Sequence, residues 1–207
     1  METDDNNMNC AEGHLGGYIR SSPEPAISGL DITHGDPMTW LPDLWRWAVS
    51  TLNIRSVLDV GCGEGHSAAY FQRLGCDVMG VDGSRFAHED SRIPERHAVH
   101  DFNNGPYEPG RHFDMIWCCE FVEHVEAQFE DNFLQTFQSA SRFVLMTHAL
   151  PGQVGWHHVN CQPPAYWIER LNHSGFRLNQ RLTDIARGLV SYGYFAQSGL
   201  VFQRAGG

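Results

Sequence analysis

A short apolar run is followed by three alternating glycines in the stretch SVLDVGCGEGHS, residues 56–67. Glycines in a turn between a strand and a helix let the backbone approach a ligand closely, and many such loops bind phosphate. This loop also contains the carboxylates Asp59 and Glu64, which oppose phosphate binding at a helix N-terminus. His66 stands where the dinucleotide fingerprint requires a small residue. The sequence therefore predicts a cationic ligand without phosphate and argues against NAD.

Two later segments supply groups that can transfer a proton. The segment CCEFVEHVE contains Glu120, Glu123 and His124, and the segment HALPGQVGWHHVNC contains the adjacent pair His157 and His158. Histidine titrates near neutral pH and suits a general base that acts on a hydroxyl nucleophile. We expect the base in the pair His157 and His158, with Glu120 and His124 as the other catalytic candidates. Glu120 and Glu123 have the alternative roles of holding their loop or excluding an acidic substrate.

The histidine loop also contains the candidate contacts to a substrate. Trp156 lies beside the histidines in a glycine-flanked loop, an unusual place for an aromatic ring that serves packing alone. Asn160, in the same loop, is the second candidate.

These segments hold enough donor atoms to raise the question of a metal ion. The donors are Cys118, Cys119, His124, His157, His158 and Cys161. Their C-C and H-H-x-x-C spacings differ from the C-x-x-C spacing of a structural zinc site. Adjacent residues of a strand point to opposite faces, so at most one of the two neighbouring cysteines faces a cleft. The three acidic ligands that a harder divalent ion requires are not evident either. We therefore expect no metal.

Strand-like and helix-like segments alternate along the chain and must position these residues. The expected strands are 56–60, 77–82, a weaker 98–102, 113–119, 142–149, 176–182 and 198–204, and the expected helices are 42–53, 64–74, 129–141 and 163–175. This alternation predicts an α/β fold with a doubly wound, mostly parallel seven-stranded sheet and helices on both faces. No long helical pattern separates the last two strands, so we expect them to form an antiparallel hairpin at one edge. Ligands of such sheets bind at the carboxyl ends of the strands, where the strand order reverses, which is where the glycines lie.

Composition limits the domain count and the partners. A chain of 207 residues has room for one sizeable core, and we expect a single domain over residues 36–207 behind a partly disordered tail, residues 1–35. The segment Tyr18–Trp40 is expected either to fold over the ligand as a lid or to remain a surface tail. The net charge is −11, and all 14 basic residues are arginines, which disfavours general nucleic-acid binding.

The cellular setting follows from the cysteines and the N-terminus. The six cysteines lack the dense spacing of a disulfide scaffold, and the acidic N-terminus does not resemble a signal peptide. No apolar run is long enough to span a bilayer. We expect a cytoplasmic protein, a monomer or homodimer, without a membrane partner.

The segments VLDVGCGEG and GVDGS, together with FDMIWCCEFVEHVE, resemble the cofactor-binding signature of the Rossmann-like (class I) S-adenosylmethionine (SAM) dependent methyltransferases. SAM carries a sulfonium and an ammonium and no phosphate, as the acidic glycine loop predicts. The resemblance implies that Asp59 supports the ammonium end, that Asp82 binds the ribose hydroxyls, and that Asp101 and Phe102 meet the adenine. The full set of expected cofactor contacts is Asp59, Gly61, Cys62, Gly63, Gly65, Asp82, Gly83, Asp101, Phe102 and Cys119.

The resemblance implies methyl transfer, with S-adenosylhomocysteine as the product, and says less about the acceptor. In-line transfer from a sulfonium needs alignment, and a base wherever the nucleophile carries a proton. We expect a small-molecule acceptor that is methylated on a hydroxyl. Methylation of an amine, modification of RNA or protein, and a non-catalytic SAM-binding scaffold remain alternatives, although CCEF stands where an N-P-P-Y amine signature would follow the fourth strand.

Overall fold

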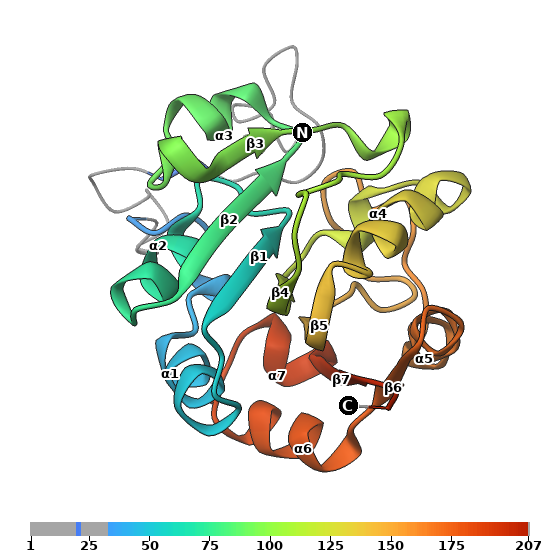
Figure 1. Cartoon of the computed structure of the whole chain (residues 1–207). Helices are drawn as coiled ribbons and strands as arrows, with labels where there is room; N and C mark the ends of the chain where they lie inside the picture. Colours follow the sequence, from blue (N-terminus) through green and yellow to red (C-terminus); the bar gives the residue numbers. More distant parts are fainter. Residues whose placement is uncertain (1–19, 22–32, 207) are drawn as a thin grey trace, which may run out of the picture.

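The computed structural model of the protein describes residues 20–21 and 33–206. Most of the expected tail, and the first part of the expected lid, lie outside these residues. The described chain forms a seven-stranded sheet of order β3-β2-β1-β4-β5-β7-β6 (Figure 1). The strands are β1 Ser56–Val60, β2 Asp77–Asp82, β3 His97–Val99, β4 Phe113–Cys118, β5 Ala140–Met146, β6 Phe176–Leu178 and β7 Leu200–Arg204.

Strand direction follows the expected pattern. β1 pairs in parallel with β2 and β4, β3 joins β2 in parallel, and β5 joins β4 in parallel. β7 is antiparallel to both β5 and β6. The predicted doubly wound, mostly parallel sheet with an antiparallel C-terminal hairpin is therefore confirmed.

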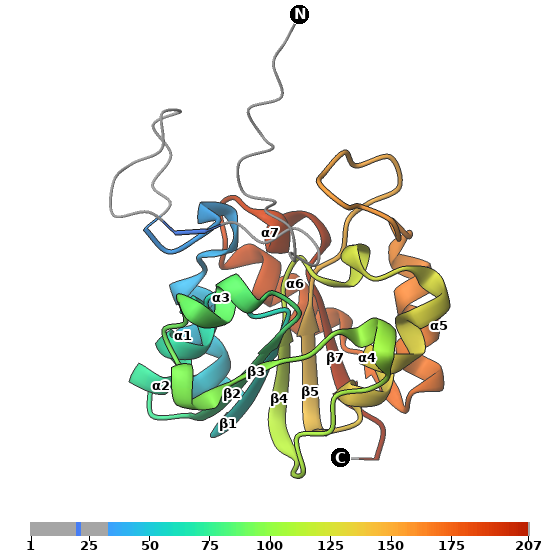
Figure 2. The same ribbon diagram turned by 90° about the horizontal axis from the view of Figure 1, so that it is seen from above.

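Helices cover both faces of the sheet (Figure 2). They are α1 Pro42–Thr51, α2 His66–Arg73, α3 Arg85–Glu89, α4 Glu130–Phe137, α5 Pro164–His173, α6 Gln180–Gly188 and α7 Tyr194–Ser198. One apolar core joins the sheet to α4 and α5, and it includes Phe133, Phe137 and Trp167. The second core, on the opposite face, joins the sheet to α1, α2, α6 and α7 and includes Trp45 and Phe195.

Local sequence explains where the predicted helices begin and end. α1 and α5 each have a proline in the first turn, where a missing N–H costs nothing. α5 is followed by Gly175 in the left-handed region (φ +81°), which ends the helix without steric strain. Residues Val57–Val60 of β1 are buried, as expected for a strand covered on both faces.

The expected strand 176–182 is too long, and two helices, α6 and α7, separate the last two strands. β6 ends at Leu178, and Asn179 then caps α6, because its side-chain oxygen accepts a hydrogen bond from the Leu182 N–H at 3.0 Å. The inner face of α6 buries the small residues Thr183 and Ala186. α6 is strongly amphipathic but rich in polar residues, and it begins at Gln180, inside the segment 176–182 that was expected to be a strand, so the helix was missed.

The strand order reverses between β1 and β4, and the loops that follow these two strands open toward the same edge of the sheet (Figure 2). This is the edge at which α/β sheets bind ligands. Among the described residues, no helix is both long and apolar enough to cross a membrane.

Candidate active site

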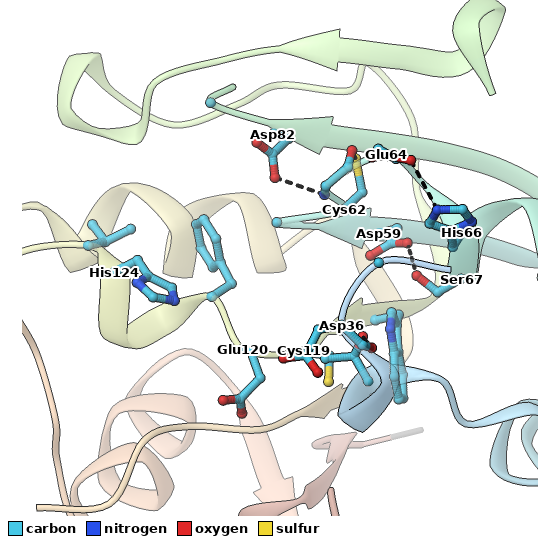
Figure 3. Close-up of a pocket in the computed structure, with 18 of the residues that line it drawn as sticks. Asp36, Asp59, Cys62, Glu64, His66, Ser67, Asp82, Cys119, Glu120 and His124 are labelled. Atoms are coloured by element: carbon cyan, nitrogen blue, oxygen red, sulfur yellow. Dashed lines mark hydrogen bonds and ion pairs between the residues drawn. The ribbon is translucent and has the colours of Figure 1, made fainter. Parts of the chain in front are cut away.

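A cavity lies at the carboxyl ends of β1, β2, β3 and β4, and Figure 3 shows many of its side chains. Its lining comes from the loops that follow β1 to β5 and from the segment that precedes α1. The expected site residues that line it are Asp59, Gly61, Cys62, Gly63, Asp82, Gly83, Asp101, Phe102, Cys119, Glu120, His124 and His157. Segments far apart in the sequence thus meet at the edge predicted for ligand binding.

The glycine loop adopts a backbone that side chains would oppose. Gly61, Gly63 and Gly65 all have positive φ values, of +73°, +52° and +77°. A Cβ on Gly61 would lie 2.5 Å from the Cβ of Phe121, the residue that follows Glu120 in the loop after β4. Glycine at position 61 is therefore required both by its conformation and by the close approach of the two loops.

The carboxylate of Glu64 is held by neighbouring protein groups. Its oxygens accept hydrogen bonds from the backbone N–H of Ser21 at 2.7 Å and from the Ser21 hydroxyl. They also lie 3.1 Å from Nε2 of His66 (Figure 3) and 3.3 Å from Nη2 of Arg92. Glu64 thus ties the loop to α2 and to the segment that follows α3, and Arg92 offsets its charge. Of the two acids that disfavoured phosphate, only Asp59 lacks an arginine partner among the described residues.

Asp59 is buried beneath the loop at the end of β1. Its Oδ2 accepts a hydrogen bond from the Ser67 hydroxyl at 2.5 Å, which links β1 to the first turn of α2. Burial raises the pKa of Asp59 to about 7, although the bonds from Ser67 and the Ala68 N–H favour the ionised form. A cationic group in the cavity would stabilise the carboxylate and lower this pKa.

Asp82 and Asp101 each fix a turn as well as lining the cavity. Oδ2 of Asp82 accepts from the Gly63 N–H at 2.9 Å, and Oδ1 accepts from the Ser84 N–H at 2.8 Å. Burial raises the pKa of Asp82 despite these bonds. Oδ1 of Asp101 accepts from the Asn103 N–H at 2.9 Å. Because a carboxylate oxygen has more than one lone pair, these bonds leave further acceptor capacity toward the cavity.

The two cavity cysteines are inert thiols. Sγ of Cys62 lies 3.6 Å from Nε2 of His97, and burial raises the pKa of Cys62 well above its ordinary value. Burial likewise raises the pKa of Cys119, whose Sγ lies 3.7 Å from the hydroxyl oxygen of Thr147. The adjacent Cys118 is buried in the core that contains α4 and α5, so the two cysteines do face opposite sides, as predicted. Neither cavity thiol is poised as a nucleophile.

The loop after β4 brings Glu120 and His124 to the cavity (Figure 3). Glu123, in the same loop, is buried and is not among the lining residues. Glu120 has a φ of +53°, and its Oε1 accepts from the Thr147 hydroxyl at 2.8 Å. Burial raises the pKa of Glu120 to about 7. Burial, and then the neighbouring Glu120 carboxyl, raise the pKa of Glu123 well above its ordinary value.

The histidine loop is locked to the loop after β4 by reciprocal contacts. Nδ1 of His124 lies 3.2 Å from the carbonyl oxygen of His157, and Nδ1 of His157 lies 3.2 Å from the carbonyl oxygen of His124. The backbone N–H groups of Val159 and Asn160 donate to the carbonyl oxygen of Glu123 at 2.9 and 3.1 Å. The two loops therefore form one wall of the site.

Four expected site residues are not placed in the cavity lining: Gly65, Trp156, His158 and Asn160. Trp156 has 53% of its surface exposed on the histidine loop. Asn160 is buried, and its side chain donates to Oε2 of Glu130 at 3.2 Å and accepts from Gln162 at 3.0 Å. The sequence places all four near the site, but it does not show which side of a loop each residue occupies.

Residues 29–185 match the protein family described as "Methyltransferase domain". The chain belongs to this methyltransferase family. The matched residues include the glycine loop and the strands from β1 to β6.

Individual relatives are more distant. The ubiquinone biosynthesis O-methyltransferase of Rhodopseudomonas palustris is 34% identical over 83 residues, which make up 38% of this chain and 33% of that protein. The match thus spans about a third of the length of that relative.

Solved structures share the fold of this methyltransferase domain. The magnesium protoporphyrin IX methyltransferase of Synechocystis PCC 6803, solved with bound SAM, superposes with a TM-score of 0.60 at 16% identity, over 81% of this chain and 79% of that chain. A sugar N-methyltransferase from a Streptoalloteichus species gives 0.61 at 15% identity, over 82% and 89%. The predicted Rossmann-like, class I methyltransferase fold is confirmed.

The segment before α1 supplies part of the methyltransferase cavity that sequence patterns did not assign to particular residues. His34, Asp36 and Trp40 line the cavity, and the rings of His34 and Trp40 stack at 4.0 Å. Asp36 caps the turn Pro37–Thr39, and burial raises its pKa. The Asp-Pro pair signals the start of a turn, but nothing in the sequence connects that turn to the sheet edge.

Proposed function

We propose that the protein transfers the methyl group of SAM to a hydroxyl group of a small molecule. The observation that carries the proposal is the cavity at the ends of β1 to β4, whose described lining presents six carboxylates and no arginine. The family match supports methyl transfer. The R. palustris relative is named an O-methyltransferase, which supports oxygen as the acceptor atom.

The residues present fit SAM. The positive-φ glycines leave room above the loop, and the buried carboxylates of Asp59 and Asp82 favour a cationic, hydroxyl-bearing ligand over a phosphate. We assign Asp59 to the ammonium end, Asp82 to the ribose hydroxyls, and Asp101 with Phe102 to the adenine. When bound, SAM supplies a methyl group on a sulfonium, whose departure leaves a neutral thioether.

We assign the general base to His157. Its Nδ1 faces a carbonyl oxygen, which can only accept, so Nδ1 carries the proton and Nε2 keeps a lone pair for the hydroxyl of the acceptor. His157 lines the cavity, whereas its neighbour His158 is not among the lining residues. The expectation of a base in this pair is thereby narrowed to His157.

The acidic surroundings narrow the acceptor class. Asp36 lines the cavity from the segment before α1, Glu120 lines it from the loop after β4, and Asp59 lines it from the end of β1. These carboxylates oppose an anionic acceptor, so we propose a neutral acceptor. We also propose that the protein works in the cytoplasm as a monomer or homodimer, without general nucleic-acid binding, given its net charge of −11.

The proposal is tested by measuring S-adenosylhomocysteine formation with SAM and a panel of matched acceptors. The panel pairs phenols, catechols and sugar alcohols with the corresponding amines. Turnover with a hydroxyl acceptor, and none with its amine, is the expected result. Turnover with amines alone would reassign the acceptor atom, and SAM binding without turnover on any acceptor would favour a scaffold.

A further inference from the structure

Three side chains of metal-binding type converge within the wall formed by the loop after β4 and the histidine loop. One potential ligand atom from each of Glu123, His124 and His158 lies within 4.8 Å of the others. The rings of His124 and His158 meet edge to face with centroids 5.1 Å apart. Two imidazoles and one carboxylate are a donor set that binds zinc or iron(II) with coordination positions left open.

Glu123 gives this cluster a second, independent feature. Its side chain is fully buried, and neither carboxyl oxygen makes a hydrogen bond of regular geometry among the described residues, although the Glu120 carboxyl and the backbone N–H groups of Glu123 and Ala149 are polar neighbours. An unpartnered buried carboxyl is costly, because water that would solvate it has been removed. No arginine of the described chain forms an ion pair with Glu123 or with the adjacent Glu120. A cation would offset the charge of both carboxylates.

Backbone carbonyls orient both histidines for metal binding. Nδ1 of His124 lies 3.2 Å from the carbonyl oxygen of His157, and Nδ1 of His158 lies 3.2 Å from that of Gln153. Each Nδ1 must carry the proton in these bonds, which leaves the lone pair on Nε2. Such outer hydrogen bonds fix the tautomer of metal-binding histidines.

We propose that Glu123, His124 and His158 bind a divalent transition-metal ion beside the methyl-transfer cavity. Imidazole ligands favour zinc, iron(II) or a similar ion over magnesium and calcium, which prefer oxygen. The cysteine spacings and the lack of an evident acidic cluster in the sequence predicted no metal. The donors proposed here include no cysteine, and they come from two loops whose approach the sequence does not show.

The position of His124 gives the ion a role that rests on the proposed function. His124 also lines the cavity, so the cluster borders the space proposed for the acceptor. If the acceptor hydroxyl binds the ion, its pKa would be lowered, and its proton would pass to Nε2 of His157 as the oxygen attacks the methyl carbon and the thioether leaves. An ion with open positions favours an acceptor with a second oxygen next to the hydroxyl, such as a catechol or a hydroxy ketone.

The test measures metal binding without SAM or acceptor. The full-length protein is stripped with a chelator and titrated with Zn²⁺ by calorimetry and with Co²⁺ by visible absorption. We expect one equivalent to bind in the wild type, and at least a 100-fold weaker affinity in Glu123→Gln and His158→Ala. His173→Ala, which alters an exposed histidine at the end of α5, is the matched control and should bind like the wild type.

The affinity of each variant for SAM separates a lost metal site from a lost fold. We expect Glu123→Gln and His158→Ala to bind SAM within about twofold of the wild type. If Glu123→Gln does not fold, His158→Ala carries the test, because its ring lies on a surface loop. Absence of Zn²⁺ and Co²⁺ binding to the wild type, or equal binding by the wild type and the two variants, would overturn the site. Metal binding without methyl transfer would leave the site standing and reject only its catalytic role.

Discussion

Asp82 joins the glycine loop to the end of β2 through its hydrogen bonds. We propose that it also binds the ribose hydroxyls of SAM. Replacing Asp82 with alanine removes the proposed contact to the ligand and the bonds from the Gly63 and Ser84 N–H groups. SAM binding should become less favourable by about 1.5–3 kcal/mol, as expected when hydrogen bonds to a charged group are lost. Calorimetry with SAM measures the change, and Asp82→Asn serves as the isosteric comparison. Unchanged affinity in both variants would show that Asp82 does not contact the ligand.

Asp59 predicts a pH dependence of SAM affinity. Its pKa of about 7 in the free protein means that the carboxylate is partly protonated at neutral pH. A cationic ligand lowers that pKa, so the Kd for SAM should rise about tenfold for each pH unit below 7 and level off above it. Asp59→Asn should remove this slope. A flat Kd between pH 5.5 and 7 in the wild type would contradict the assignment.

The folding stability of the ligand-free protein should fall as the pH rises toward 7, whereas the affinity for SAM increases over the same range. The pKa of Asp59 is higher in the folded state than its ordinary value of 3.8, so the folded state binds the proton more tightly. The contribution of Asp59 to folding therefore becomes less favourable as pH rises from about 4 to 7. Asp59→Asn should raise the melting temperature of the ligand-free protein at pH 8, although it weakens SAM binding.

His157 should affect turnover and leave cofactor binding intact. His157→Ala removes the proposed base, so kcat/KM should fall about 10²–10⁴-fold, while the Kd for SAM stays near that of the wild type. His157→Gln keeps a comparable side-chain length without a basic nitrogen and should be equally impaired. Full activity of both variants with the true acceptor would assign the proton transfer to Glu120 or another group.

At the scale of elements, the approach of the glycine loop to the loop after β4 is the feature most easily tested. An alanine Cβ at position 61 would lie 2.5 Å from Phe121, and φ at this position is +73°. Gly61→Ala should cost about 2–4 kcal/mol of unfolding free energy and weaken SAM binding. Gly75→Ala is the matched control, because φ is +88° there and no atom lies within 4 Å of the added Cβ. Denaturant unfolding should show a loss of only about 1 kcal/mol of unfolding free energy for the control. Equal losses in the two variants would mean that Phe121 can move away from the added Cβ without cost.

Strong local patterns made most elements predictable. β1 is a short, mostly apolar run and was predicted with its observed bounds. α5 begins at a proline and is followed by a glycine, and its two ends were predicted within two residues. α6 was missed because its first residues were assigned to the expected strand 176–182 and because most of its residues are polar. β3 is only three residues long, and its short pairing with β2 is a tertiary effect that a local pattern cannot carry.

At the scale of the whole molecule, the part of the site that the sequence predicted is the part built on strand ends. The positions of Asp59 and Asp82 follow from the fold, because parallel strands end at one edge. The histidine loop is longer and has no regular structure, so the sequence did not show that His157 lines the cavity and His158 does not. Likewise, the convergence of Glu123 with His158 depends on contacts between two loops that are distant in sequence.

The central claim is that the cavity at the reversal of strand order binds SAM, and calorimetric titration of the full-length protein tests it most directly. SAM and S-adenosylhomocysteine should each bind with one equivalent, and NAD should give no heat of binding. Binding of NAD without binding of SAM would contradict both the proposed cofactor and the function built on it.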